Sequence, residues 1–223
     1  MSGLVLLRHG ESTANADDSF AGWLDVPLTS RGIAQAEAAG RGLADLRPAA
    51  VHASVLDRAV RTARLMAAAA GWDAPLRPDW RLNERHYGAL QGLDKAGARR
   101  RYGTAAVEAW RRSTDIAPPP ATAEQQARQL ADPRYARDPR ARLTVTESLG
   151  DVARRMAPYW REVLQPELAH GDTVVVVSHG NALRVLVHLV TGMPLEEAAQ
   201  LAVPTATPLM RPALVLSDPP PAR

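Results

Sequence analysis

Two short apolar segments of this chain each end in a histidine followed by a glycine. Residues 4–7 lead into Arg-His-Gly and the valine-rich residues 173–177 lead into Ser-His-Gly, so the two histidines are His9 and His179. Apolar runs of this length predict strands buried on both faces of a parallel sheet. Because ligands of such sheets bind beyond the carboxyl ends of the strands, we expect both histidines to lie at one binding edge.

Strand and helix patterns alternate along the chain, which predicts an α/β fold. We expect a three-layer sandwich with a mainly parallel central sheet and helices on both faces. The predicted strands are residues 4–7, 51–53 and 173–177. The first predicted helix has Thr29 or Ser30 as its candidate cap, and the second runs from Ser54 to about Gly71. A third covers 147–169, with Val163 in its core stripe and a kink at Pro158, and a fourth follows residues 178–181 and ends at Gly192.

A single domain over residues 1–223 fits the length of the chain. The least regular stretch is 73–146, with a helical pattern near 94–110, and it is interpreted as a cap-like insertion that covers one end of the sheet. A proline-rich tail starts at about residue 204. Within that tail Pro212 restricts the segment 209–216 to an edge strand or a loop.

Composition excludes several classes of function. The chain has no cysteine, so disulfides, thiolate nucleophiles and cysteine metal sites are excluded. It has neither a basic leader nor an apolar stretch near the roughly 20 residues that span a bilayer, so we expect a cytoplasmic protein without membrane contact. A net charge of +3, with basic residues spread along the chain, favours small phosphorylated anions over nucleic acid as partners.

His9 is the candidate nucleophile. A single histidine after a strand is more often structural, but two His-Gly strand ends in one chain favour a function. An imidazole attacks phosphorus when a neutral nitrogen faces it and cationic donors accept the charge on the phosphoryl oxygens. Arg8 and His179 are the nearest candidates for those donors, and each glycine is expected to allow the backbone to approach a ligand closely.

Arginines supply the candidate phosphate clamp. Arg58 and Arg61 are predicted in the first turn of the helix after Ser54, where a cation opposes the helix dipole. A residue that is unfavourable for the local structure is typical of a functional site, although Arg58 would be an ordinary surface residue if it faced solvent. Of the 27 basic residues, only Lys95 is a lysine. The lysine could be kept because this position needs a compact ammonium group, or its presence could be chance.

Several stretches, taken together, resemble one family. Arg-His-Gly-Glu-Ser at 8–12 is similar to the signature of the histidine phosphatase superfamily, and longer stretches resemble its phosphoglycerate mutase branch, most specifically residues 82–95. The matching stretches are 8–12, 20–25, 54–59, 82–95, 110–112, 132–136, 146–149 and 178–181. They cover nearly the whole chain, from about residue 4 to about 210.

The resemblance implies a phosphoglycerate mutase that interconverts 2- and 3-phosphoglycerate in glycolysis and gluconeogenesis. His9 would carry the phosphoryl group and Glu84 would be the general acid and base, although a loop glutamate has an ordinary structural alternative. The bisphosphate 2,3-bisphosphoglycerate would be primer and intermediate, without a metal. The implied catalytic set is His9, Glu84, His179, Arg8 and Arg58, and the implied substrate-binding set is Arg8, Asn15, Ala21, Gly22, Arg58, Glu84, Arg85, Tyr87, Lys95, Arg111, Arg112, Gly180 and Asn181.

The chain departs from the family pattern at four places. Ala14 replaces the usual tryptophan, Ala21 replaces a threonine whose hydroxyl touches the ligand, and Ala206 stands where glycine is usual. Residues 210–213 replace a more strand-like run. These changes bear on how tightly substrate is held and on the balance between mutase and phosphatase activity.

The sequence leaves two alternative functions open. A phosphatase of small phosphorylated metabolites would use the same phosphohistidine with water as acceptor, if residues 84–112 failed to exclude water. A binding protein that kept the fold and lost turnover would not need the full set of His9, Arg58, Glu84 and His179. The resemblance also implies a homodimer or homotetramer.

Overall fold

The computed structural model describes residues 3–136 and 138–212. None of the described helices is both long and apolar enough to span a membrane. The elements, in chain order, are β1 (Gly3–Arg8), α1 (Thr13–Ala16), α2 (Ser30–Gly42), β2 (Ala50–Ala53), α3 (Asp57–Ala70), β3 (Leu76–Pro78), the 3₁₀ turns η1 (Trp80–Leu82) and η2 (Gly88–Leu90), α4 (Lys95–Tyr102), α5 (Thr104–Arg112), α6 (Ala123–Ala131), the 3₁₀ turn η3 (Pro133–Tyr135), α7 (Pro139–Leu143), α8 (Leu149–Tyr159), the π-helical turn η4 (Trp160–Leu164), α9 (Gln165–Ala169), β4 (Thr173–Ser178), α10 (Gly180–Thr191), α11 (Leu195–Ala198) and β5 (Leu209–Pro212).

The strands form one five-stranded sheet in the order β3-β2-β4-β1-β5. All neighbouring pairs are parallel except β1 with β5, which is antiparallel. Pro212 is the last described residue of the edge strand β5 and the register partner of Gly3, and an edge strand is where a sheet tolerates proline. This confirms a mainly parallel sheet; the part of the predicted 209–216 segment beyond Pro212 lies outside the described residues.

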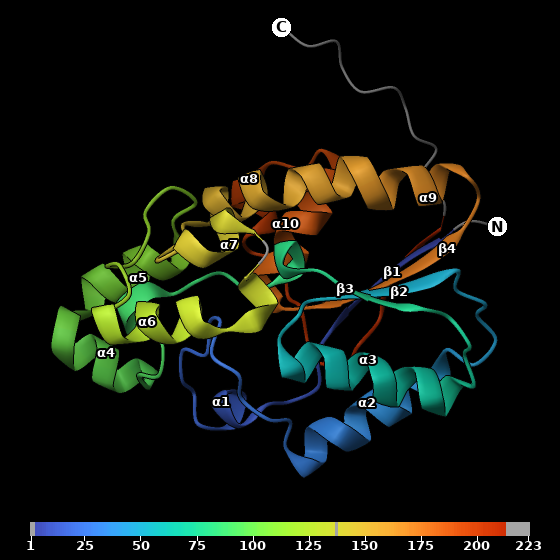
Figure 1. Ribbon diagram of the computed structural model, residues 1–223, viewed down its shortest axis with the longest axis horizontal. Helices are drawn as coiled ribbons and strands as arrows, with labels where there is room; N and C mark the ends of the chain where they lie inside the picture. The colour runs from blue at the N-terminus through green and yellow to red at the C-terminus, as the bar shows by residue number, and fades with distance from the viewer. Residues whose placement is uncertain (1–2, 137, 213–223) are drawn as a thin grey trace, which may run out of the picture.

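Alternating side chains of the central strands build two cores, one on each face of the sheet. Leu4 and Leu6 of β1 pack with α8 and α10, whereas Val5 and Leu7 pack with α2 and α3. Figure 1 shows α2 and α3 below the sheet and α8 and α10 above it. The run of valines in β4 is buried for the same reason, because both faces are covered. The predicted three-layer sandwich is confirmed.

Helix ends follow the predicted capping residues. The Thr29 side chain accepts the N–H of Gly32 at the start of α2, which settles the choice between Thr29 and Ser30. Gly71 and Gly192 follow α3 and α10 with φ of 67° and 70°, the left-handed conformation that glycine adopts without strain.

The helix predicted over 147–169 contains a π-helical turn that the sequence pattern did not predict. Its backbone continues past Pro158 to Tyr159 and then widens over Trp160–Leu164 before α9. A π turn adds one residue to the repeat, so the next core position falls one residue later. Leu164 is therefore fully buried in this turn, and the predicted Val163 is half-buried and packs against the same core.

The range 73–146 contributes to both the sheet and a separate layer. Its first residues include β3, which pairs with β2 at the edge of the sheet. The helices α4 to α7 lie beyond the carboxyl ends of β1 and β4, on the left of Figure 1. Part of this layer has its own small core, formed by Phe20, Leu90, Ala98 and Val107. The layer therefore faces the edge at which both histidines were predicted.

Ala206 adopts a strained backbone conformation. Its φ is 49°, in the left-handed region, and its N–H donates to the carbonyl of Arg8 at 2.9 Å. An alanine there costs about 1 kcal/mol relative to glycine. We expect Ala206→Gly to raise the melting temperature by about 2–4 °C in thermal unfolding. Ala68→Gly, on the exposed side of α3, is the matched control and should lower it; a fall in both variants would contradict this explanation.

Candidate active site

The adjacent parallel strands β1 and β4 bring the two histidines together. Arg8 and Ser178 are register partners, and the N–H of His9 donates to the carbonyl of Ser178 at 2.9 Å. The His9 and His179 ring centroids lie 4.9 Å apart, and both side chains are buried. The two histidines therefore lie at one edge of the sheet, as predicted.

His9 is held as a neutral imidazole with a defined tautomer. Its Nδ1 lies 2.6 Å from the carbonyl oxygen of Gly10, which can only accept, so Nδ1 carries the proton and Nε2 carries the lone pair. Burial, and then the nearby Arg58 and Arg8, hold the pKa of His9 well below its ordinary value. At neutral pH Nε2 is therefore an available nucleophile.

Gly10 fits this edge for a reason other than ligand approach. A Cβ at Gly10 would lie 2.2 Å from the carbonyl oxygen of Gly32, and one at Gly32 would lie 2.0 Å from that of Glu11. The loop after β1 thus crosses the start of α2 with backbone against backbone. This packing requires a glycine at position 10, and the close ligand approach expected there stays a prediction.

His179 has the opposite tautomer. Its Nε2 lies 2.8 Å from Ser54 Oγ, whose own proton goes to Asn83 Oδ1 at 3.0 Å. The Val55 N–H also donates to that Asn83 oxygen, which fixes the orientation of the amide. His179 Nε2 must therefore donate, and Nδ1 carries the lone pair. That Nδ1 atom is buried without a hydrogen-bond partner among the described residues.

The pKa of His179 is also held well below its ordinary value. Burial is the main cause, followed by the charges of Arg58, His9 and Arg8. His179 is thus neutral at neutral pH, and it must gain a proton at Nδ1 before that atom can donate to an anion. An arriving phosphoryl group supplies the negative charge that favours this protonation.

Ser54 is expected to set the tautomer of His179. In Ser54→Ala the Nε2 acceptor is lost, and we expect turnover to fall about tenfold, less than the loss of a direct oxyanion donor. The ¹⁵N shifts of the His179 ring should change from those of a single tautomer to those of a mixture. A slower enzyme with unchanged ¹⁵N shifts would mean that Ser54 acts only through stability, since Leu56 N–H also donates to its hydroxyl.

Four arginines around the site donate to backbone carbonyls. Among the described residues, none of the four forms an ion pair with a carboxylate within 4 Å. The donations are Arg8 to Val203 O at 3.0 Å, Arg58 to Gly22 O and Leu24 O at 2.7 and 2.8 Å, Arg85 to Trp110 O at 2.9 Å, and Arg184 to Leu201 O at 2.9 Å. Carbonyls hold these guanidiniums in place without neutralising them, which favours the binding of anions.

Arg58 is completely buried and does not face solvent. It lies in the first turn of α3, next to the start of the helix at Asp57. Burial lowers its pKa to about 10, so it stays charged at neutral pH. Arg61 lies beyond that first turn and is exposed, which corrects its predicted place. The surface alternative for Arg58 is excluded.

A cavity of about 240 Å³ joins most of the predicted site residues. It is lined by Arg8, His9, Ser12, Asn15, Ser19, Phe20, Ala21, Gly22, Arg58, Glu84, Tyr87, Lys95, Arg111 and Arg184. A second cavity of about 260 Å³ has Arg85 and Asn181 in its wall and shares Tyr87, Arg111 and Arg184 with the first. His179 and Gly180 are not among the lining residues of these two cavities, and the side chain of Arg112 lies outside the described residues.

Some predicted ligand-binding side chains already have polar partners. Lys95 is ion-paired with Asp18, and Arg111 with Glu108 at 3.0 Å. The Asn15 Oδ1 accepts from the backbone and hydroxyl of Ser12 in a capping box. A ligand would therefore compete with carboxylates for Lys95 and Arg111, but not for the four carbonyl-bound arginines.

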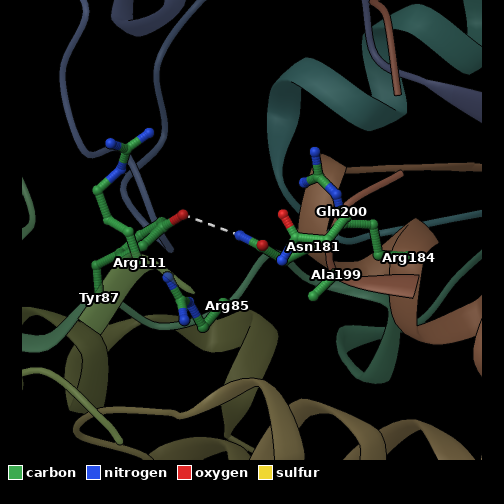
Figure 2. A pocket seen from close by; sticks show the side chains of 7 residues that line it. All are labelled: Arg85, Tyr87, Arg111, Asn181, Arg184, Ala199 and Gln200. Atoms are coloured by element: carbon green, nitrogen blue, oxygen red, sulfur yellow. Dashed lines mark hydrogen bonds between the residues drawn. The ribbon is translucent and has the colours of Figure 1, made fainter. Parts of the chain in front are cut away.

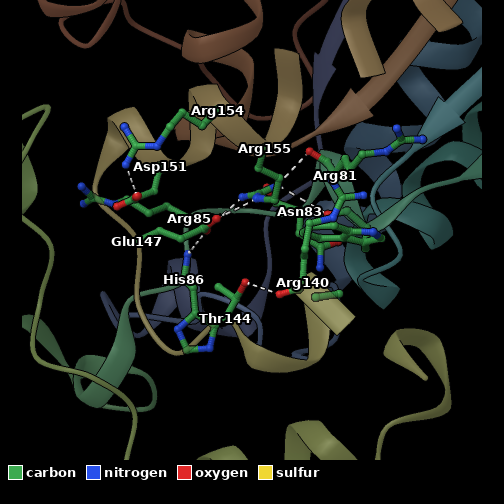
Figure 3. A network of polar contacts seen from close by, with 12 residues as sticks. Arg81, Asn83, Arg85, His86, Arg140, Thr144, Glu147, Asp151, Arg154 and Arg155 are labelled. Atoms are coloured by element: carbon green, nitrogen blue, oxygen red, sulfur yellow. Dashed lines mark hydrogen bonds and ion pairs between the residues drawn. The ribbon is translucent and has the colours of Figure 1, made fainter. Parts of the chain in front are cut away.

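Glu84 is carried by a loop that a buried ion pair organises. Arg155 pairs with Glu147 at 2.7 Å, and both side chains are buried. The same guanidinium donates to loop carbonyls that include those of Asn83 and Glu84, and Glu147 accepts the N–H of His86 (Figure 3). Glu84 Oε1 accepts the N–H of Arg85 at 2.8 Å. The glutamate at the cavity wall thus has a fixed backbone.

Sequence reasoning missed Arg155, Ser54, Asn83 and Arg184. The first three act through contacts between residues far apart in the chain, which no local pattern reveals. Arg184 had a readable signal, because it follows Gly180 by four residues and so lies on the same face of α10.

The fold and the site together define a class: an α/β protein whose geometry suits the transfer of a phosphoryl group through a histidine. The model of the histidine phosphatase superfamily (branch 1) matches residues 4–132 and 120–209. A 2,3-bisphosphoglycerate-dependent phosphoglycerate mutase of Thermobifida fusca (strain YX) is 48% identical over 214 residues, 94% of this chain and 86% of that protein. A protein of the same name from Mycobacterium leprae (strain TN) is 49% identical, with 92% and 84% covered. The chain belongs to this superfamily and, within it, to the 2,3-bisphosphoglycerate-dependent phosphoglycerate mutase family.

Solved structures similar to this chain include hydrolases. A structure described as mycobacterial hydrolase 1 is 28% identical, has a TM-score of 0.75, and is matched over 94% of this chain and 88% of that one. A mycobacterial glucosyl-3-phosphoglycerate phosphatase in complex with VO₃ is 28% identical with a TM-score of 0.74, over 94% and 90%. The same fold therefore carries phosphatases as well as mutases.

Proposed function

We propose that this chain interconverts 2-phosphoglycerate and 3-phosphoglycerate through a phosphohistidine at His9. The observation that carries the proposal is the neutral His9 imidazole, whose lone pair is on Nε2 in a cavity lined by arginines that carbonyls hold in place. The family membership of the chain supports the same reaction. The primer and intermediate would be 2,3-bisphosphoglycerate.

The reaction balances with His9 and Glu84 as the reacting groups. As the Nε2–phosphorus bond forms, the phosphorus–oxygen bond of the bisphosphate breaks, and the leaving oxygen takes a proton from Glu84. In the return step the Glu84 carboxylate accepts the proton of the attacking hydroxyl. Arg8, Arg58 and protonated His179 would stabilise the charge on the phosphoryl oxygens during both steps.

The remaining predicted residues would hold the part of the substrate that does not react. Arg85, Tyr87, Lys95, Arg111 and Arg112 would bind the carboxylate and the second phosphate. Ala21, at the cavity wall, offers no hydroxyl for this purpose. Gly22, another residue of the predicted binding set, has a φ of 51° and packs against the side chain of Gln91. Its carbonyl accepts a hydrogen bond from Arg58.

The assay is a coupled measurement of 3-phosphoglycerate conversion with and without 2,3-bisphosphoglycerate, repeated with a chelator. We expect the bisphosphate to stimulate the rate and the chelator to leave it unchanged, because arginines meet the phosphoryl charge. Inhibition by the chelator would contradict this mechanism.

A second candidate function, hydrolysis of small phosphorylated metabolites, is favoured by the similarity to mycobacterial phosphatase structures.

A further inference from the structure

Two charged residues, Asp25 and Arg134, form an ion pair beside the start of α3. They belong to the stretches 20–25 and 132–136, and the reaction scheme gives neither of them a role. Neither is among the residues that line the first cavity or the second, whose wall Figure 2 shows. Any part that they have in the reaction must therefore act through a residue that does line a cavity.

The loop that carries Asp25 holds Arg58 in two ways. The Arg58 guanidinium donates to the carbonyls of Gly22 and Leu24, at 2.7 and 2.8 Å. Asp25 Oδ1, in the same loop, accepts the backbone N–H of Asp57, the residue before Arg58, at 2.9 Å. The loop thus fixes the main chain beside Arg58 as well as its charged group. A shift of the loop relative to α3 would move the carbonyls that hold the guanidinium at the cavity wall.

Asp25 also supplies what the start of α3 lacks. Leu56, at the N-cap position, has no side-chain oxygen to accept a free N–H of the first turn. The Asp25 carboxylate accepts one of these N–H groups and places a negative charge where the helix dipole favours it. The same charge acts on Arg58, whose pKa is lowered by burial and raised by the carboxylates of Glu84 and Asp25. Asp25 therefore offsets the unfavourable placement of a cation in the first turn.

Arg134 fixes the position of Asp25. Its Nη1 donates to the other carboxylate oxygen of Asp25 and, at 3.2 Å, to the carbonyl of Val55 just before α3. Its Nε donates to both carboxylate oxygens of Asp132, at 2.9 and 3.0 Å, so the long side chain is already ordered. The side chains of Arg134 and Asp25 are 30% and 38% exposed, and an isolated pair with that exposure would contribute little. The additional bonds of Arg134 make this pair a fixed link between the loop and the helix start.

We propose that Asp25, held by Arg134, is a positioning residue for Arg58. It keeps the guanidinium at the cavity wall, where the reaction needs a donor to the phosphoryl oxygens. This inference rests on the proposed role of Arg58 in binding those oxygens. It is separate from the support of His179, which depends on Ser54. Loss of Asp25 should therefore weaken the binding of a phosphoryl group without changing the tautomer of His179.

Phosphate binding by the unphosphorylated protein tests the positioning role. In Asp25→Ala we expect the dissociation constant of inorganic phosphate, measured by calorimetric titration, to rise about tenfold, because a misplaced donor loses a charge-assisted hydrogen bond. Labelling of His9 by p-nitrophenyl phosphate should slow by a similar factor. Asp25→Asn keeps an oxygen that can accept the Asp57 N–H, and it should bring the phosphate affinity back to within about threefold of the wild type.

Thr122→Ala is the matched control, because it removes the cap of α6, a helix that carries no residue of the predicted site. It should lower the melting temperature as Asp25→Ala does, but leave phosphate affinity and His9 labelling unchanged. The ¹⁵N shifts of the His179 ring in Asp25→Ala should stay those of a single tautomer. A mixture of tautomers there would mean that the loss of Asp25 disturbs the whole site, and it would overturn the positioning role.

A double-mutant cycle separates this inference from the proposed function. If Asp25 acts only through Arg58, Asp25→Ala should have no further effect on phosphate affinity in an Arg58→Gln background. Full additivity of the two changes, or a wild-type phosphate affinity in Asp25→Ala, would overturn the inference and leave the role of Arg58 intact. A wild-type phosphate affinity in Arg58→Gln alone would overturn the role of Arg58 itself, and the inference with it.

Discussion

Replacing His9 by alanine is expected to abolish the acid-labile phosphoenzyme and to lower isomerisation by at least ~10⁴-fold, because the covalent route is lost. His179 is not expected to take over, since its Nε2 donates to Ser54 and its Nδ1 has no lone pair once it is protonated to donate to the phosphoryl group. The measurement is transfer of ³²P from labelled 2,3-bisphosphoglycerate, followed by acid and alkaline treatment of the labelled protein. Phosphohistidine should be lost in acid and survive in alkali.

Two variants serve as controls for the His9 experiment. His170→Ala removes an exposed histidine near the far end of β4 and should label like the wild type. His179→Ala should still label at His9, but more slowly, because the phosphoryl oxygens lose one donor. Label that persists in His9→Ala would show that the nucleophile is misassigned.

Glu84→Gln is expected to lower phosphoryl transfer from phosphoglycerates by ~10²–10⁴-fold, the usual contribution of general acid and base catalysis. The change removes the transferable proton but keeps an oxygen that can accept the Arg85 N–H, so the loop held by Arg155 should stay in place. Single-turnover labelling of His9 by 2,3-bisphosphoglycerate measures this step directly.

A substrate with a good leaving group provides the internal control for Glu84. The p-nitrophenolate ion leaves without a proton, so labelling of Glu84→Gln by p-nitrophenyl phosphate should remain close to the wild-type rate. Equal losses with both phosphoryl donors would mean that Glu84 supports the site as a whole rather than moving a proton. In that case the acid and base would have to be another group.

The fold and the catalytic edge were predictable because their signals are local. Apolar runs that end in His-Gly place His9 and His179 at the carboxyl ends of strands, and a parallel sheet brings those ends to one edge. The caps at Thr29, Gly71 and Gly192 follow from single-residue backbone preferences. Arg58 required the additional argument that a cation in a first helical turn is unfavourable unless it has a function.

The supporting shell was not predictable from the sequence, because it depends on contacts across the fold. The tautomer of His179 depends on Ser54 and Asn83, whose positions in the chain are far from it. The Glu84 loop depends on Arg155, which donates to carbonyls of residues far from it in the chain, those of Asn83 and Glu84. The π-helical turn after Tyr159 similarly buries Leu164 completely, in addition to the predicted Val163, which is half-buried against the same core.

The departures from the family pattern now have structural meanings. Ala14 is buried in the short helix α1, Ala21 lies in the wall of the cavity that His9 lines, and Ala206 has a left-handed backbone next to Arg8. Their effect on how tightly substrate is held, and so on the balance between mutase and phosphatase activity, stays a prediction. A homodimer or homotetramer and a cytoplasmic location stay predictions.

The most direct test of the central claim compares two rates in one reaction. Purified protein is given 3-phosphoglycerate with catalytic 2,3-bisphosphoglycerate, and the formation of 2-phosphoglycerate and of inorganic phosphate is followed in parallel. Our account predicts that isomerisation is stimulated by the bisphosphate and exceeds phosphate release. Phosphate release that outruns isomerisation would contradict it and would identify the chain as a phosphatase.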